Sequence, residues 1–122
     1  MIILNDKRFC NETFYYANNI DDIHNSPNNS TIVFDYKEEN LSIYKFCKDN
    51  LINYAIEIKS ISEFIFVSNL KAKYAFCSNL ELAKQLQKIA DNYLLETKVI
   101  LKSSINDIEN IALNEIDGIF VI

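Results

Sequence analysis

The chain has 122 residues, of which 49% are hydrophobic and 24% charged, which is enough apolar material for one domain core and too much for a disordered chain. Its net charge of −5 argues against nucleic acid as a partner, because phosphate binding needs a concentrated basic surface. No apolar run approaches the roughly 20 residues of a membrane-spanning helix, and no signal peptide is recognisable. We therefore expect a soluble, cytoplasmic protein without membrane contact.

The first 30 residues are irregular. Residues 1–4 and 13–17 have the composition of short strands, and residues 19–25 fit one helical turn. The stretch 25–30 is rich in Asn and Ser around a proline, which is typical of a loop. We interpret residues 1–30 as an extension that packs on the same sheet as the remainder, because the segment is too short to form a domain of its own.

From residue 31 onward, runs of β-branched and aromatic residues alternate with amphipathic patterns. Five strands are predicted, at 31–36, 54–59, 73–77, 97–102 and 119–122. Four helices are predicted between them, at 38–50, 61–70, 79–94 and 104–115. The helix at 79–94 has the clearest pattern, because Leu82, Leu86 and Ile89 recur at helical spacing while charged and amide side chains fill the opposite face.

A serine follows each of three predicted strands, with an acidic residue three positions later, as in a capping box. These pairs are Ser60 with Glu63, Ser78 with Glu81 and Ser104 with Asp107. Strands that alternate with capped helices form parallel sheets with right-handed crossovers. The prediction is a single α/β domain over residues 1–122, with three layers and a mainly parallel sheet of about five β-α units. We expect the doubly wound, flavodoxin-like arrangement, and the unit length of about 20 residues leaves a half (β/α) barrel as the alternative.

Several classes of site are excluded by residue type. Gly118 is the only glycine, so no phosphate-cradling loop and no dinucleotide fingerprint is present. The three cysteines, Cys10, Cys47 and Cys77, are far apart in the chain, which disfavours a zinc site or disulfide framework and favours reduced, buried thiols. His24 is the only histidine and fits a surface position. We expect no metal ion and no cofactor.

The ends of the predicted strands are the best place for a ligand, because parallel α/β sheets bind ligands beyond the carboxyl ends of their strands. Asp35, Lys59, Ser78 and Lys102 fall there. Two lysines beside helix N-termini favour a small anionic ligand. The ordinary alternative is that the serine caps a helix and the lysines point into water.

Glu57 stands in an otherwise apolar strand. A carboxylate in a central strand is costly unless it is paired. We therefore predict an edge strand with the Glu57 face in water, and Lys59, two residues further on the same face, is the expected partner if the strand is central.

Residues 61–70 form an unusual helix, because apolar side chains occur on nearly all of its faces. A short helix of this kind is either buried or covered by a partner. Ile61, Phe64, Ile65 and Phe66 are therefore the predicted interface residues, and either a homodimer or an unidentified protein partner is expected. An exposed edge strand is the other candidate interface.

No nucleophile lies at a recognisable spacing from a base. The leading hypothesis is therefore a non-enzymatic binding or protein-interaction module. The alternative is a small-anion-binding protein, or an enzyme, with its site at the carboxyl ends of the strands.

Overall fold

The computed structural model describes all residues 1–122. Its strands are β1 (Ile2–Leu4), β2 (Phe14–Tyr16), β3 (Thr31–Asp35), β4 (Tyr54–Glu57), β5 (Tyr74–Cys77), β6 (Lys98–Ser103) and β7 (Gly118–Val121). Its helices are α1 (Ile20–His24), α2 (Leu41–Asp49), α3 (Ile61–Asn69), α4 (Leu80–Tyr93) and α5 (Ile108–Leu113). Short 3₁₀ turns, Glu38–Asn40 and Ile105–Asp107, lead into α2 and α5. None of these helices has the length and apolar character needed to cross a membrane.

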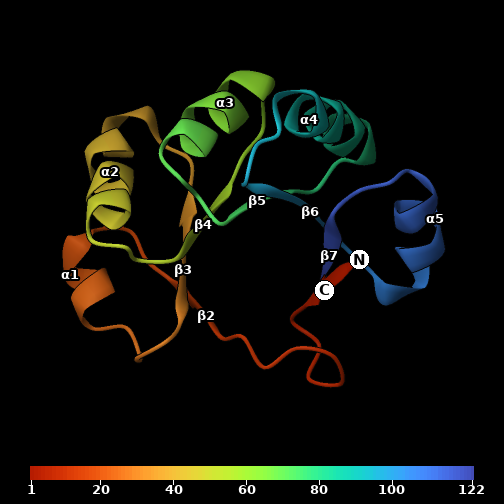
Figure 1. The fold of residues 1–122 in the computed structure, drawn as a ribbon. Coiled ribbons are helices and arrows are strands. Elements are labelled where there is room, and N and C mark those ends of the chain that lie inside the picture. Colours follow the sequence, from red (N-terminus) through yellow and green to blue (C-terminus); the bar gives the residue numbers. More distant parts are fainter.

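All seven strands are parallel and form one sheet in the order β1-β7-β6-β5-β4-β3-β2. The predicted α/β fold with a parallel sheet is confirmed, and of the two expected arrangements the structure has the half-barrel one. The doubly wound order is not observed, because that order reverses direction within the sheet, whereas here each strand from β3 to β7 lies beside the previous one. Successive right-handed crossovers in one direction place the helices on one face. Figure 1 shows these helices in an arc outside the curled sheet.

The first 30 residues contribute both edges of the sheet. β1 pairs with β7 and β2 pairs with β3, so two strands that are neighbours in sequence lie at opposite ends of the strand order. Residues 5–13, which we call the N-terminal strap, connect them. The red segment in Figure 1 runs from β1 below the sheet to β2, on the side away from the helices.

The outer face of the sheet and the inner sides of the helices form the larger core, a cluster of 22 buried residues. α4 shows why a helix forms there. The side chain of Asn79 accepts a hydrogen bond from the Leu82 N–H and caps the first turn, and Ala83, Leu86 and Ala90 are buried at helical spacing. The predicted cap, Ser78, lies one residue too early, because α4 begins at Leu80.

Each helix from α2 to α5 ends in the same kind of turn. The residue in the left-handed conformation is Leu51, Lys71, Leu94 or Glu115, with φ between 52° and 62°. The amide of the following residue bonds back to a buried helix residue, as when Leu95 N–H donates to the Ala90 carbonyl. This is the Schellman geometry, in which glycine is usual. The chain makes the four turns without glycine at that position.

The inner face of the sheet carries a smaller core of seven buried residues, including Phe76 and Phe120. Phe14 of edge strand β2 packs on Phe120 of β7, with 5.3 Å between ring centroids. The curl of the sheet therefore brings its two ends together around an aromatic interior. Gly118 permits the close pairing of β7 with β1, because a Cβ at this position would lie 2.5 Å from the Ile2 carbonyl oxygen.

Candidate functional site

The inner face changes from apolar to polar at the carboxyl end of the sheet. On β4 the inward positions are Ala55 and then Glu57, and on β6 they are Ile100 and then Lys102. Glu57 and Lys102 form an ion pair across the intervening strand β5, with 25% and 20% of their side chains exposed. A partly buried pair of this kind is less screened than a surface salt bridge and is fixed in position.

The ammonium of Lys102 has aromatic neighbours as well. It lies 5.5 Å from the centroid of the Phe120 ring and 6.0 Å from that of Tyr16. Burial by itself lowers the pKa of Lys102, but the hydrogen bond and charge of Glu57, together with smaller contributions from Tyr16, outweigh it, so the net pKa is raised. Lys102 therefore stays protonated at neutral pH, and it acts as a fixed cation rather than as a nucleophilic amine.

The expectation of a solvent-facing edge strand for Glu57 was wrong. β4 lies inside the sheet between β3 and β5. The partner of Glu57 is Lys102, 45 residues away in sequence, and not Lys59. Lys59 lies beyond the end of β4, where the backbone turns toward α3, so the alternation of sides along the strand no longer applies to it.

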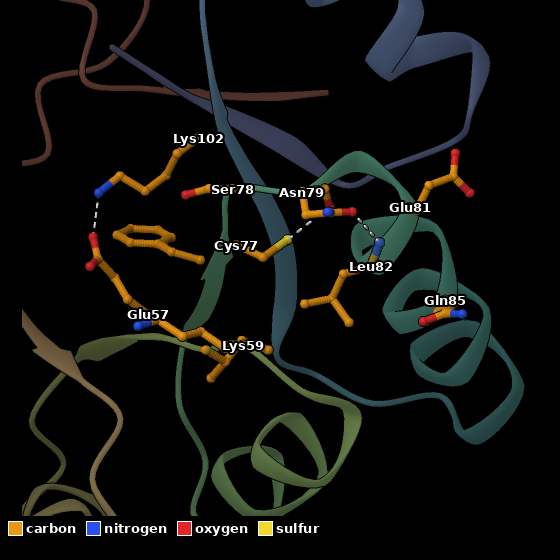
Figure 2. A pocket seen from close by; sticks show the side chains of 11 residues that line it. Glu57, Lys59, Cys77, Ser78, Asn79, Glu81, Leu82, Gln85 and Lys102 are labelled. Atoms are coloured by element: carbon orange, nitrogen blue, oxygen red, sulfur yellow. Dashed lines mark hydrogen bonds and ion pairs between the residues drawn. The ribbon is translucent and has the colours of Figure 1, made fainter.

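A cavity of about 460 Å³ opens above the carboxyl end of β5, and Figure 2 shows the side chains around it. We call it the strand-end cavity. It is lined by Glu57, Ile58, Lys59, Phe76, Cys77, Ser78, Asn79, Glu81, Leu82, Gln85 and Lys102. The ion pair lies at one side of the cavity and the first turns of α4 at the other (Figure 2).

Three of the four predicted ligand residues, Lys59, Ser78 and Lys102, line this cavity together. Asp35 does not. It is exposed on β3, in register with Glu57 but one strand further from the cavity, and its backbone carbonyl accepts a hydrogen bond from the buried Tyr44. Strand-end position therefore predicted the edge of the sheet at which this cavity lies, but it did not show which strand ends share the cavity.

Sequence reasoning missed the contribution of α4. Glu81, Leu82 and Gln85 line the cavity from the first turns of this helix. Leu82 was expected to be purely a core residue. The available signal was that α4 follows directly on β5, so its first turns must stand beside the end of that strand.

The local backbone around the cavity is held by capping interactions. The Ser60 side chain accepts a hydrogen bond from the Glu63 N–H, as predicted. The Glu63 carboxylate accepts from the Lys59 N–H, one residue before the cap. These bonds fix the turn from β4 into α3 and hold the backbone of Lys59 at the cavity rim.

Two of the three thiols are unreactive because of their surroundings. Cys47 and Cys77 are buried, and burial raises the pKa of Cys47 to about 12 and that of Cys77 to about 11. Cys77 lines the cavity but is a protonated, weakly polar surface there at neutral pH. His24 is exposed, with its ring edge-on to Phe46. No group of three potential metal-ligating side chains is found in the structure.

The predicted interface helix divides into two faces. Phe64 is fully buried against the sheet and belongs to the larger core, so it is unavailable to a partner. Ile61, Ile65 and Phe66 are 36%, 42% and 46% exposed. The all-round apolar character of this helix thus reflects a buried face together with a separate exposed apolar strip.

Comparison of the sequence with protein-family models and with curated proteins found no match. The function of the chain is therefore inferred from the geometry of its own residues.

Proposed function

We propose that the protein binds a small molecule in the strand-end cavity without transforming it. The observation that carries the proposal is the Glu57–Lys102 pair, which stands partly buried at the cavity side on top of an otherwise apolar sheet face. Desolvating two charges opposes folding, and replacing such pairs by apolar side chains is often neutral or stabilising. A pair in this position is therefore better explained by recognition of a polar ligand than by stability.

A binding role is favoured over catalysis by the state of the reactive groups. Lys102 is held protonated by Glu57, and the thiol of Cys77 has a raised pKa. Neither is an activated nucleophile. The cavity offers fixed hydrogen-bonding groups and an apolar wall, which are the elements of a recognition site.

Native mass spectrometry of gently purified protein tests the proposal. We expect a bound small molecule, or one acquired from a metabolite mixture, that is lost in Ser78→Tyr. Ser78 is exposed in the bend between β5 and α4 at the cavity, so the larger ring fills the cavity without entering the core. The matched control is Ser42→Tyr, an exposed serine on α2. Adducts that persist in Ser78→Tyr, or the absence of any adduct in the wild-type protein under both conditions, contradict the proposal.

The second candidate function is self-association through α3. Its exposed positions are Ile61, Ser62, Ile65, Phe66 and Asn69, and none is charged. The exposed face of α4, by contrast, carries Glu81, Lys84 and Lys88 among others, so the uncharged strip is peculiar to α3. An uncharged strip lets two copies of a chain with net charge −5 approach with little repulsion.

Size-exclusion chromatography with light scattering tests this second function. We expect a concentration-dependent dimer that Phe66→Glu abolishes and that Lys88→Glu, on the charged face of α4, leaves intact. Phe64→Asp is unsuitable, because it places a carboxylate in the core and unfolds the chain. A wild-type monomer at all concentrations contradicts self-association.

A further inference from the structure

The strand-end cavity is electrically balanced. The charged side chains that line it are two carboxylates, Glu57 and Glu81, and two ammonium groups, Lys59 and Lys102. Lys102 is already paired with Glu57 inside the cavity. The two lysines on which the expectation of an anionic ligand rested therefore share the cavity with two carboxylates, which the sequence pattern did not place there.

Three polar groups in the cavity wall have unused bonding capacity. Glu57 Oε1 accepts from Lys102, while no hydrogen bond reaches its second carboxylate oxygen. The Lys59 ammonium has no carboxylate within 4.0 Å, since the five ion pairs of the structure do not include it. Ser78 is exposed, and its hydroxyl makes no hydrogen bond within the chain. One free acceptor with negative charge and one free cation thus stand at the same cavity.

The other walls are apolar. They are Ile58, which directly follows β4, Phe76 and Cys77 of β5, and Leu82 of α4. A ligand that used only the charged groups would leave this surface in contact with water. The cavity therefore fits a molecule that has both charges at one end and an apolar group at the other.

We propose that the ligand of this cavity is a zwitterion of the α-amino acid class with an apolar side chain. Its ammonium bonds to the free oxygen of Glu57, and its carboxylate lies between the Lys59 ammonium and the Ser78 hydroxyl. Its side chain packs against Ile58 and Leu82. This assignment rests on the proposed ligand-binding function and specifies its substrate class.

Isothermal titration calorimetry with matched probes tests the assignment. L-leucine and L-phenylalanine are compared with isopentylamine, which lacks the carboxylate of leucine, with 4-methylpentanoate, which lacks its ammonium, and with inorganic phosphate. We expect at least one of the two amino acids to bind, and isopentylamine and 4-methylpentanoate to bind about tenfold more weakly than L-leucine or worse, because each loses one charge-assisted hydrogen bond.

Two variants separate the roles of the charged groups. Lys59→Met is expected to weaken the binding of L-leucine about tenfold and to leave the binding of isopentylamine unchanged. Glu57→Gln removes the negative charge that attracts the ammonium of the ligand and pairs with Lys102, so 4-methylpentanoate is expected to bind this variant at least as tightly as L-leucine does. Lys88→Met is the matched control, because Lys88 is an exposed helical lysine outside the cavity.

The outcomes distinguish the two proposals. If 4-methylpentanoate or phosphate binds the wild-type protein as tightly as the amino acids do, the cavity is an anion site. In that case the amino-acid assignment fails while the ligand-binding function stands. The same holds if native mass spectrometry identifies a cavity ligand of another class. If no probe binds and no cavity adduct is found, both proposals fail. Equal weakening of L-leucine binding by Lys59→Met and Lys88→Met also overturns the assignment.

Discussion

The two faces of the sheet are built differently. The outer face is covered by helices and shares a core of 22 buried residues with them, whereas the inner face buries seven residues under the N-terminal strap and its own curvature. The outer core follows from the alternation of strands and amphipathic helices. The inner core exists only because the sheet curls until Phe14 of edge strand β2 meets Phe120 of β7, the strand next to the opposite edge. A face without covering helices can therefore be buried when the sheet closes on itself.

The most direct test compares one phenylalanine from each face. Phe34 of β3 is buried in the outer core and Phe76 of β5 in the inner core. Each substitution by alanine is expected to lower the free energy of unfolding by about 3–5 kcal/mol, because both remove a fully packed aromatic ring. Urea denaturation measures the two losses. A loss for Phe76→Ala below half that for Phe34→Ala would show that the inner face is loosely packed and would break the comparison.

The second test concerns the closure of the sheet at β1. Gly118→Ala places a methyl group 2.5 Å from the Ile2 carbonyl oxygen and 2.9 Å from Ile100 Cδ1, so β1 must move away from β7. We expect a loss of about 2–3 kcal/mol in the free energy of unfolding, which is typical of overpacking in a core. Hydrogen exchange should show reduced protection of the Leu4 amide in the variant. Unchanged protection and stability would mean that β1 adapts without opening the sheet.

The third test concerns the strap. Glu12 accepts hydrogen bonds from Thr31, Tyr74 and Lys73, at 2.5, 2.7 and 2.9 Å, and these anchor the strap across the inner face. Burial raises the pKa of Glu12, but the three bonds outweigh it and the net pKa lies below the usual value of 4.5. At neutral pH, Glu12→Gln is expected to lower the free energy of unfolding by about 1–2 kcal/mol, because the group that accepts from the Lys73 ammonium is then uncharged.

The pH dependence of this effect has a definite sign. Because the folded-state pKa of Glu12 is depressed, its stabilisation is fully present above about pH 4.5 and is lost as the pH falls through the folded-state value. The difference in unfolding free energy between the wild-type protein and Glu12→Gln should therefore shrink from pH 6 to pH 3. Glu96→Gln, at an exposed glutamate without an ion pair, is the control and should show no such change. A constant difference would show that the strap is held by packing alone.

The smallest expected effect concerns the turns that return the chain from the helix layer to the sheet. Leu94 is 87% exposed and has φ of 52°, a conformation that costs L-residues about 1–2 kcal/mol. Leu94→Gly is expected to raise the free energy of unfolding by about 0.5–1 kcal/mol, since relief of strain exceeds the entropy of glycine. Leu113 is 83% exposed but belongs to α5. Leu113→Gly should therefore lower the free energy of unfolding by about 0.5–1 kcal/mol, because glycine disfavours the helix. Thermal denaturation of both variants shows whether each substitution raises or lowers the stability. Changes in the same direction would contradict the explanation.

The sequence by itself determined the elements and their type. The strands and helices from residue 31 onward lie where β-branched runs and helical periodicity place them, because each pattern reports which side of a local element is buried. The sequence also determined the edge of the sheet at which Lys59, Ser78 and Lys102 lie, since the carboxyl ends of parallel strands are all at the same edge. The single glycine of the chain likewise leaves no glycine-rich sequence of the kind that forms phosphate-binding loops.

Only the tertiary structure decided how these elements are combined. Whether successive crossovers continue in one direction or reverse is not encoded in the local pattern of any unit, so the half barrel could not be chosen over the doubly wound sheet. The partner of Glu57 was equally inaccessible, because the Glu57–Lys102 pair depends on the register of β4, β5 and β6 over 45 residues. Local patterns specify which side of an element is buried, whereas charge pairing and the shape of a cavity depend on contacts between elements that are distant in the chain.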